Sequence, residues 1–292
     1  MLKTVKPFIK WAGGKNQLLN IIRSKYPENI KKYCEPFVGG GAVLFDVLAN
    51  FKPEEILIND INPELINTYI HIRDNTEDII NRLFDMQEIF WRMDNNKRKE
   101  YFYIQRDKFN EGIKNNINDV AMAVLFIFLN KTCFNGLYRV NSKGLYNVPI
   151  GSYKKPLICD SDNLRVISNL LQNIIIRCGD YSNCTDFIDS STFVYIDPPY
   201  RPLNETSRFT SYSKTVFGDE QQIQLSKFTE CMSEKGAKIL ASNSDPKNTD
   251  ENDNFFDDIY RNFNITRVKA SRMINSKGSG RGTLNELLIS NF

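Results

Sequence analysis

Short apolar segments alternate with longer stretches of helical periodicity along most of this chain, and this alternation restricts the fold more than any other feature. Several of the apolar segments are bounded by Gly, Pro or Asn-Asp pairs, as strands commonly are. The strand candidates lie at residues 32–35, 55–58, 174–177, 192–196, 238–241 and 286–290. Because strands that alternate with helices usually form a mostly parallel sheet with helices on both faces, we expect an α/β fold of that kind.

The pattern changes in the middle of the chain. Residues 65–90 and 97–129 carry apolar side chains three and four positions apart, which predicts helices. Residues 134–156 then bring Gly, Asn and Pro together with aromatic residues, which predicts a loop or hairpin. We therefore predict a sheet domain formed by residues 1–62 and 158–292, with a mainly helical domain inserted at residues 63–157.

Composition excludes several classes of protein. The longest apolar run, Val120 to Leu129, is far shorter than the ~20 residues that span a bilayer. The first residues have no apolar signal-peptide core, so we expect a cytoplasmic protein. His71 is the only histidine, which excludes a mechanism that needs two. The six cysteines never form C-x-x-C, so we expect reduced packing residues and no metal site.

The net charge of +3 conceals an uneven distribution of charge. Residues 131–159 contain five Lys and Arg and no acid, and residues 259–285 contain six and again no acid. Residues 245–258, by contrast, carry six acids. Basic stretches of this kind suggest a polyanionic partner. Charge alone, however, favours the simpler interpretation of two solvated surfaces.

A glycine-rich segment follows the first strand candidate. Residues 35–43 read EPFVGGGAV and open a helix candidate. Consecutive glycines allow a tight turn and let the backbone approach a ligand, although a simple strand-to-helix turn also fits. Asp60 closes the next strand about 20 residues later, where an acid accepts hydrogen bonds from ribose hydroxyls in nucleotide-binding α/β folds. Asp60 as a helix N-cap is the alternative, but the spacing favours a ribose of NAD, an adenylate or S-adenosylmethionine.

A second glycine pair lies near the N-terminus, in Trp11-Ala12-Gly13-Gly14-Lys15. It is not a Walker A loop, because Ile9 stands where that motif needs Gly and Asn16 follows the lysine. Lys15 can instead contact a carboxylate, and Trp11 can stack on an aromatic ligand. The alternative for Trp11 is a packing role.

The sequence Asp197-Pro198-Pro199-Tyr200 directly follows the strand candidate 192–196. Two prolines make a rigid loop at the carboxyl end of a strand, where α/β sheets bind ligands. The Asp197 carboxylate and the Pro198 carbonyl are acceptors, and Tyr200 offers an aromatic face. This set suits the exocyclic amine of a nucleobase, because two acceptors that hold its hydrogens direct the nitrogen lone pair toward an electrophile. A structural Pro-rich loop is the alternative.

Taken together, these motifs resemble the Dam-type DNA adenine-N6 methyltransferases, the alpha-class D12 family. Their order is that family's alpha arrangement: glycine loop, recognition insert, catalytic loop. The resemblance implies a Rossmann-like methyltransferase sheet and methyl transfer from S-adenosylmethionine to N6 of an adenine that is flipped out of duplex DNA. It is carried by residues 11–15, 36–41, 59–60, 134–141, 147–154, 197–200 and 281–286.

The resemblance also implies a role for individual residues. The catalytic residues would be Asp197, Pro198, Pro199 and Tyr200. The cofactor-binding residues would be Trp11, Ala12, Gly13, Lys15, Phe37, Val38, Gly39, Gly41, Asp60, Ile61, Asp180, Tyr181 and again Asp197. The DNA-binding residues would be Lys10, Phe134, Asn135, Leu137, Arg139, Asn141, Lys143, Pro149 and Lys154, the basic hairpin spanning about residues 134–156.

By the same resemblance the expected site is GATC, with Arg139 and Lys10 reading guanines. A restriction endonuclease of the same specificity is a possible partner, and a monomer would suffice. Two other kinds of protein stay open from the sequence: an RNA or protein-glutamine N-methyltransferase, and a DNA-binding relative that has lost catalysis. The first commonly has Asn where this chain has Asp197, and intact motifs oppose the second.

Overall fold

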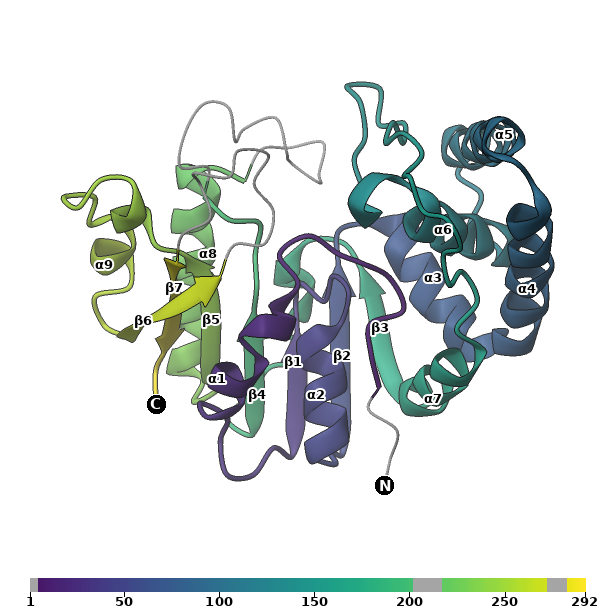
Figure 1. Ribbon diagram of the computed structural model, residues 1–292. Coiled ribbons are helices and arrows are strands. Elements are labelled where there is room, and N and C mark those ends of the chain that lie inside the picture. Colours follow the sequence, from purple (N-terminus) through teal and green to yellow (C-terminus); the bar gives the residue numbers. More distant parts are fainter. Residues whose placement is uncertain (1–4, 202–216, 272–282) are drawn as a thin grey trace.

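A computed structural model describes residues 5–201, 217–271 and 283–292. Within these residues one seven-stranded sheet has the order β3-β2-β1-β4-β5-β7-β6 (Figure 1). The first five strands of that order are parallel, and β7 runs antiparallel to both β5 and β6. This confirms the expected mostly parallel α/β fold. The strands are β1 Lys32–Glu35, β2 Glu55–Asp60, β3 Ile174–Cys178, β4 Thr192–Ile196, β5 Lys238–Ser244, β6 Asn264–Ser271 and β7 Thr283–Ser290.

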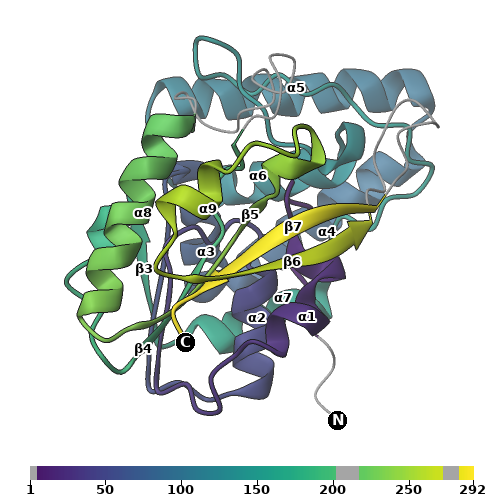
Figure 2. The same cartoon turned by 90° about the vertical axis from the view of Figure 1, so that its left-hand side faces the viewer.

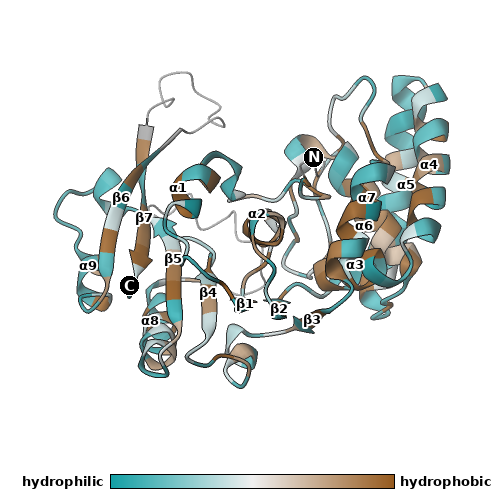
Figure 3. Ribbon diagram, turned by 90° about the horizontal axis from the view of Figure 1, so that it is seen from below, coloured by the Kyte–Doolittle hydropathy of each residue, from teal (hydrophilic) through white to brown (hydrophobic). Residues whose placement is uncertain are grey.

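Helices cover both faces of the sheet, and Figure 3 shows α2 (Ala42–Asn50) on one face and α8 (Asp219–Glu234) on the other. Strand β4 is buried throughout, and its side chains alternate between two apolar clusters. Phe193 and Tyr195 belong to one cluster, and Val194 and Ile196 to the other. Burial on both faces explains why β4 is a continuous apolar run in the sequence.

Of the five α-helices between β2 and β3 in the chain, the first four are grouped beyond the β3 edge of the sheet (Figure 1). Each of the two long helices expected here is in fact two helices. Asn75 interrupts the first with φ −134°, and Asn116 in the left-handed region with φ 52° follows the third helix. The helices are α3 Pro63–Asp74, α4 Thr76–Arg92, α5 Asn95–Lys114 and α6 Val120–Thr132.

The remaining helices complete the layers around the sheet. They are α1 Leu19–Arg23, α7 Ser161–Leu171 and α9 Phe255–Ile259. Figure 2 shows the β6–β7 pair crossing in front of the parallel strands, with α9 beside it. No helix within the described ranges is both long and apolar enough to cross a membrane.

One apolar cluster extends from the sheet into the helices of the insert. It contains Phe193 of β4 and Ile58 of β2 together with Tyr69 of α3 and Phe128 of α6. This core is continuous between the sheet and the insert, so it does not mark a boundary between them. The predicted domain boundaries after residue 62 and after residue 157 therefore stay a prediction.

Candidate active site

The two loops that carry the motifs leave the sheet at the same place. Strands β1 and β4 are neighbours, but the chain continues from β1 to β2 on one side and from β4 to β5 on the other. Ligands of open α/β sheets bind outside the carboxyl ends of strands at such a switch point. The glycine loop follows β1 there, and Asp197 to Tyr200 follow β4.

The glycine loop is locked against the N-terminal segment. Gly39 and Gly41 both have positive φ, of 47° and 74°. A Cβ atom at Gly39 would lie only 2.8 Å from Cδ1 of Trp11, so no larger residue fits at this position. The indole of Trp11 also stacks on Tyr138, with ring centroids 5.8 Å apart. Trp11 therefore has the packing role considered from the sequence, whatever ligand it also meets.

Asp60 braces the glycine loop from the neighbouring strand. Its Oδ2 accepts a hydrogen bond from the backbone N–H of Gly39 at 3.0 Å, and its Oδ1 accepts one from Asn62 at 2.9 Å. Burial raises the pKa of Asp60, and these N–H groups oppose the shift. The N-cap of α3 is Asn62, whose side chain accepts from Leu65, so the N-cap alternative for Asp60 is wrong.

The other expected cofactor residues line the same edge of the sheet. Ile61 is 54% exposed, although it is apolar and directly follows Asp60. The rings of Phe37 and Tyr181 lie 5.5 Å apart. Asp180 is exposed and accepts a hydrogen bond from the Ser182 N–H. The structure thus brings acids and apolar side chains together here.

Two of the expected cofactor-binding residues form hydrogen bonds within the site through their backbone groups. Val38 is buried, and its N–H donates to the carbonyl of Asn59 at 2.9 Å. The carbonyl of Gly13 accepts from the ammonium group of Lys15 at 2.7 Å. Ala12 lies between Trp11 and Gly13 in this exposed turn.

Asp197 is held by groups from two other parts of the chain. Its Oδ1 lies 2.8 Å from Nζ of Lys15, which is only 4% exposed, and accepts from the Ser242 hydroxyl at 2.9 Å. Among the described residues, none donates a hydrogen bond to Asp197 Oδ2 or to the carbonyl of Pro198. Asp197 Oδ2 and the Pro198 carbonyl, the two acceptors expected for a nucleobase amine, therefore receive no hydrogen bond from the described residues.

The rest of the catalytic loop is also fixed. The amide of Gln222 on α8 donates to the Pro199 carbonyl at 3.0 Å. The Tyr200 hydroxyl donates to Oε2 of Glu286 at 2.7 Å, and Nζ of Lys15 lies 4.7 Å from the Tyr200 ring centroid. Burial raises the pKa of Tyr200, and the carboxylates of Asp197 and Glu286 raise it further. The phenol is therefore protonated and able to donate.

Three of these residues received no role from the sequence: Ser242, Gln222 and Glu286. They come from β5, α8 and β7, which are far from residues 197–200 in the chain. No local motif marks them, because only the order of strands in the sheet brings them to this loop. Asn285-Glu286 was part of the family pattern, but that pattern did not assign it a function.

The segment at residues 134–156 contains isolated antiparallel bridges, between Cys133 and Ile150 and between Val140 and Tyr146. Phe134 is 52% exposed and lies at the base of this hairpin, directly after α6. Asn135 is exposed with a left-handed φ of 56°, and Leu137 is half-buried. The Pro149 carbonyl accepts from the Phe134 N–H at 2.8 Å and thereby ties the two sides together.

The polar residues of this hairpin face outward. Arg139 is exposed, and its Nε donates to Oδ1 of Asn147 at 2.8 Å, which fixes one end of the guanidinium. Asn141 is used within the turn, where Oδ1 accepts from the N–H groups of Lys143 and Leu145. The exposed cations that the sequence also assigned to DNA are Lys10, Lys143 and Lys154.

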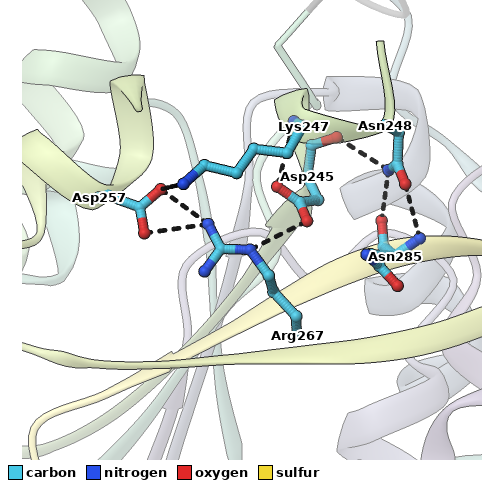
Figure 4. A network of polar contacts seen from close by, with 6 residues as sticks. All are labelled: Asp245, Lys247, Asn248, Asp257, Arg267 and Asn285. Carbon is cyan, nitrogen blue, oxygen red and sulfur yellow. Dashed lines mark hydrogen bonds and ion pairs between the residues drawn. The ribbon is translucent and has the colours of Figure 1, made fainter. Parts of the chain in front are cut away.

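The acidic stretch at residues 245–258 and the basic stretch at 259–285 pair with each other (Figure 4). The Asp245 carboxylate, fully buried, accepts from Nε of Arg267 at 3.1 Å, and Asp257 accepts from the other end of the same guanidinium. Lys247 also reaches Asp257, at 3.3 Å. Arg267 therefore forms its ion pairs with carboxylates of the protein itself. Arg272, Lys277 and Arg281 lie outside the described residues.

No group of three or more His, Cys, Asp or Glu side chains within the described ranges is arranged to hold a metal ion. The parallel strands, the reversed β7 between β5 and β6, and the loops meeting at the switch point define a Rossmann-like methyltransferase fold. Comparison with known proteins then narrows the class.

The chain belongs to the D12 class of N6 adenine-specific DNA methyltransferases, whose family pattern matches residues 11–274. It is 48% identical to the Type II methyltransferase M.MjaIII of Methanocaldococcus jannaschii, with 99% of each chain covered. It is 36% identical to a DNA adenine methylase of Haemophilus influenzae, with 97% and 92% covered. Identity to the DNA adenine methylase of Escherichia coli is 33%, with 98% and 95% covered. The expected family is confirmed, and the protein is an adenine-specific DNA methyltransferase.

Proposed function

We propose that this enzyme transfers the methyl group of S-adenosylmethionine to N6 of an adenine that it flips out of duplex DNA, at the sequence GATC. The observation that carries the proposal is the arrangement of the loop after β4. Asp197 Oδ2 and the Pro198 carbonyl are two acceptors without hydrogen bonds from described residues, and they lie beside the glycine loop at the switch point of the sheet.

The residues at the carboxyl edge of β1, β2 and β3 fit an adenosine. Asp60 accepts hydrogen bonds from the backbone N–H groups of Gly39 and Asn62, and its carboxylate would use a further lone pair for the ribose hydroxyls. The exposed Ile61 and the rings of Phe37 and Tyr181 offer apolar faces to a base, and Asp180 offers an acceptor to its amine. Trp11, Ala12, Gly13 and Lys15 would border the methionine end.

When bound, S-adenosylmethionine would supply a methyl group on a positively charged sulfur, and it would leave as neutral S-adenosylhomocysteine once the bond between that carbon and the sulfur breaks. Asp197 and Pro198 accept the two hydrogens of the adenine amine and so direct its lone pair toward that methyl group. The nitrogen becomes positive as its bond to carbon forms, and the fixed carboxylate of Asp197 stabilises this charge. Loss of one amine proton restores neutrality. Tyr200 provides the aromatic face against which the base stacks.

The basic hairpin supplies the contacts to DNA in this proposal. The exposed Phe134 and the half-buried Leu137 fill the gap that the flipped adenine leaves, and Asn135 pairs with the orphaned base. Arg139 and Lys10 read guanines, and Pro149 lies near a thymine. Asn141, Lys143 and Lys154 contact the phosphate backbone of the DNA. Such contacts fix the position of the enzyme on the duplex but do not select its sequence. Residues 63–157 would then form the target-recognition domain.

Two further points follow from the relatives and the site. Relatives named Type II methyltransferases support a restriction endonuclease of the same specificity as a partner of this enzyme. A single chain carries every residue of the proposed site, which supports a monomer as the active species.

Transfer of labelled methyl from S-adenosylmethionine to two duplex oligonucleotides tests the proposal. The duplexes are identical except that GATC in the first is replaced by GTTC and its complement in the second. We expect label on the first alone. Label on both would retain the chemistry and remove the assigned specificity. Label on neither, with cofactor bound, would point to an RNA or protein acceptor.

A further inference from the structure

Glu286 reaches the catalytic loop because of the way β7 joins the sheet. Strand β7 pairs with β5 in the antiparallel sense, and this register places Glu286 opposite Ser244 at the carboxyl end of β5. The loop after β4 lies next to this end of β5. The Glu286 carboxylate there accepts the hydroxyl hydrogen of Tyr200 at 2.7 Å.

The ring of Tyr200 has a partner at its hydroxyl, Glu286, and another over its face. The ammonium group of Lys15 lies over the ring, 4.7 Å from its centroid, while it forms the ion pair with Asp197. A tyrosine side chain turns about two bonds, and anchoring its hydroxyl restrains the first rotation and so the position of the ring. A phenolic O–H prefers to lie in the plane of its ring, so the direction of this hydrogen bond also favours one ring plane. Lys15 occupies one face of the ring, so the proposed base would stack on the opposite face.

We infer that Glu286 is a positioning residue for methyl transfer, which holds the ring of Tyr200 in the plane on which the target adenine stacks. The inference rests on the proposed stacking role of Tyr200. It goes further by assigning a function to Glu286 of β7, for which the family pattern gives none. Glu286 acts through Tyr200 and touches neither reactant.

The backbone at this position does not depend on the Glu286 side chain. Asn248 accepts from the N–H of the preceding residue, Asn285, at 2.9 Å and donates to its carbonyl at 2.7 Å (Figure 4). The ladders with β5 and β6 hold the strand on both sides. Substitution of Glu286 should therefore release the Tyr200 hydroxyl without moving β7.

The test measures kcat and the KM for S-adenosylmethionine and duplex in Glu286→Ala, Glu286→Gln and Tyr200→Phe. We expect Glu286→Ala to lower kcat about tenfold, because a misplaced base reacts slowly, with little change in the cofactor KM. Glu286→Gln keeps an acceptor and should retain most of kcat. Tyr200→Phe should match Glu286→Ala, and the double variant should lose no more than either single variant. The control is Glu230→Ala. It removes an exposed carboxylate on α8 that accepts a hydrogen bond from Asn262, and it should leave kcat unchanged.

Three outcomes would overturn the inference: unchanged kcat in Glu286→Ala, losses that add in the double variant, or a fall in the thermal midpoint that accounts for the lost activity. Tyr200→Ala separates this failure from failure of the proposed site. If Tyr200→Ala loses activity and Glu286→Ala does not, only the role of Glu286 is wrong. If Tyr200→Ala transfers methyl at the normal rate, the stacking role of Tyr200 fails as well.

Discussion

Asp197 combines two properties that suit its proposed role in methyl transfer. One oxygen is committed to Lys15 and Ser242, which fixes the orientation of the group, and the other is left to accept from an amine. In the proposed reaction its negative charge stabilises the positive charge that develops on the amine nitrogen. The sequence predicted the Asp of this loop and a carboxylate partner for Lys15. It did not predict that this partner is Asp197 or that Ser242 joins the pair, because tertiary structure sets their proximity.

Asp197→Asn tests this pair of roles. The amide removes the negative charge and presents hydrogens to an amine that also presents hydrogens, so we expect turnover to fall by roughly a thousandfold. Cofactor binding, followed by calorimetric titration, should remain measurable. The matched control is Asp78→Asn, an exposed carboxylate paired with Arg82 on α4, which should turn over normally. Near-normal turnover in Asp197→Asn would refute the catalytic assignment.

Glu35, at the end of β1, is a buried carboxyl group with a predictable effect on stability. It is 2% exposed and accepts from the Tyr33 hydroxyl at 2.7 Å. Burial raises the pKa of Glu35 well above its ordinary value of 4.5. The folded state therefore favours the protonated form. This stabilisation is fully present below the unfolded pKa and is lost as the pH rises through the folded pKa.

Glu35→Gln is neutral at every pH and can still accept from Tyr33. We therefore expect the Tm of this variant to exceed that of the wild type at about pH 8.5, by more than any difference at about pH 5.5. Scanning calorimetry at both pH values measures the two differences. A difference that does not change with pH would show that the carboxyl does not titrate on unfolding in this range.

At the scale of elements, the apolar strands were predictable, and one edge strand, β6, was not. Strands β1 and β4 have the expected bounds, and β4 is a continuous apolar run because it is buried on both faces. Strand β6 was missed: it lies at the edge of the sheet and contains Arg267 and Lys269, so its sequence indicated a basic surface. The long helices were predicted without their breaks, since Asn75 and Asn116 interrupt backbone geometry without interrupting the apolar spacing.

The hairpin at residues 134–156 carries the prediction on sequence specificity. Asn147 occupies Nε of Arg139, which leaves the two terminal nitrogens of the guanidinium to meet O6 and N7 of a guanine. Arg139→Ala should lower the preference for the correct base at one guanine position by about 10–100-fold, corresponding to ~1–3 kcal/mol. Competition between duplexes that differ at that base pair measures the preference.

Lys143→Ala is the matched control on the same hairpin. Loss of a phosphate contact should weaken binding equally on all sequences and reduce its salt dependence. If Arg139→Ala also weakens all duplexes equally, Arg139 is a backbone contact and the assigned readout is wrong.

The network of Figure 4 holds β6 and α9 against the end of β5. Arg267→Ala would leave the fully buried carboxylate of Asp245 without its guanidinium partner, so we expect the free energy of unfolding to fall by about 2 kcal/mol. Lys247→Ala removes only a partly exposed ion pair with Asp257 and should cost less than about 1 kcal/mol. Urea titration of both variants measures the costs, and equal values would contradict the distinct role of Asp245.

At the scale of the whole molecule, the helical insert and the sheet are tied by polar contacts as well as by the shared core. The Tyr69 hydroxyl of α3 donates to the Gly39 carbonyl at 3.0 Å. Asn130 of α6, which is buried, exchanges two hydrogen bonds with the backbone of Lys10, at 2.8 and 2.9 Å. These bonds join the insert to the glycine loop and to the N-terminal segment. Loss of either part would leave buried polar groups of the other without partners.

We therefore expect the protein to unfold in one transition, although the sequence divides it into two domains. The chain has two tryptophans, and Trp91 lies on α4 within the insert. In Trp11→Phe, fluorescence reports on the insert alone, while circular dichroism reports on all helices and strands. The two midpoints in urea should coincide, and the calorimetric enthalpy should equal the van't Hoff enthalpy. A fluorescence midpoint clearly below or above the dichroism midpoint would mean that the insert is a separate folding unit, and the shared core would then not couple DNA recognition to the catalytic sheet.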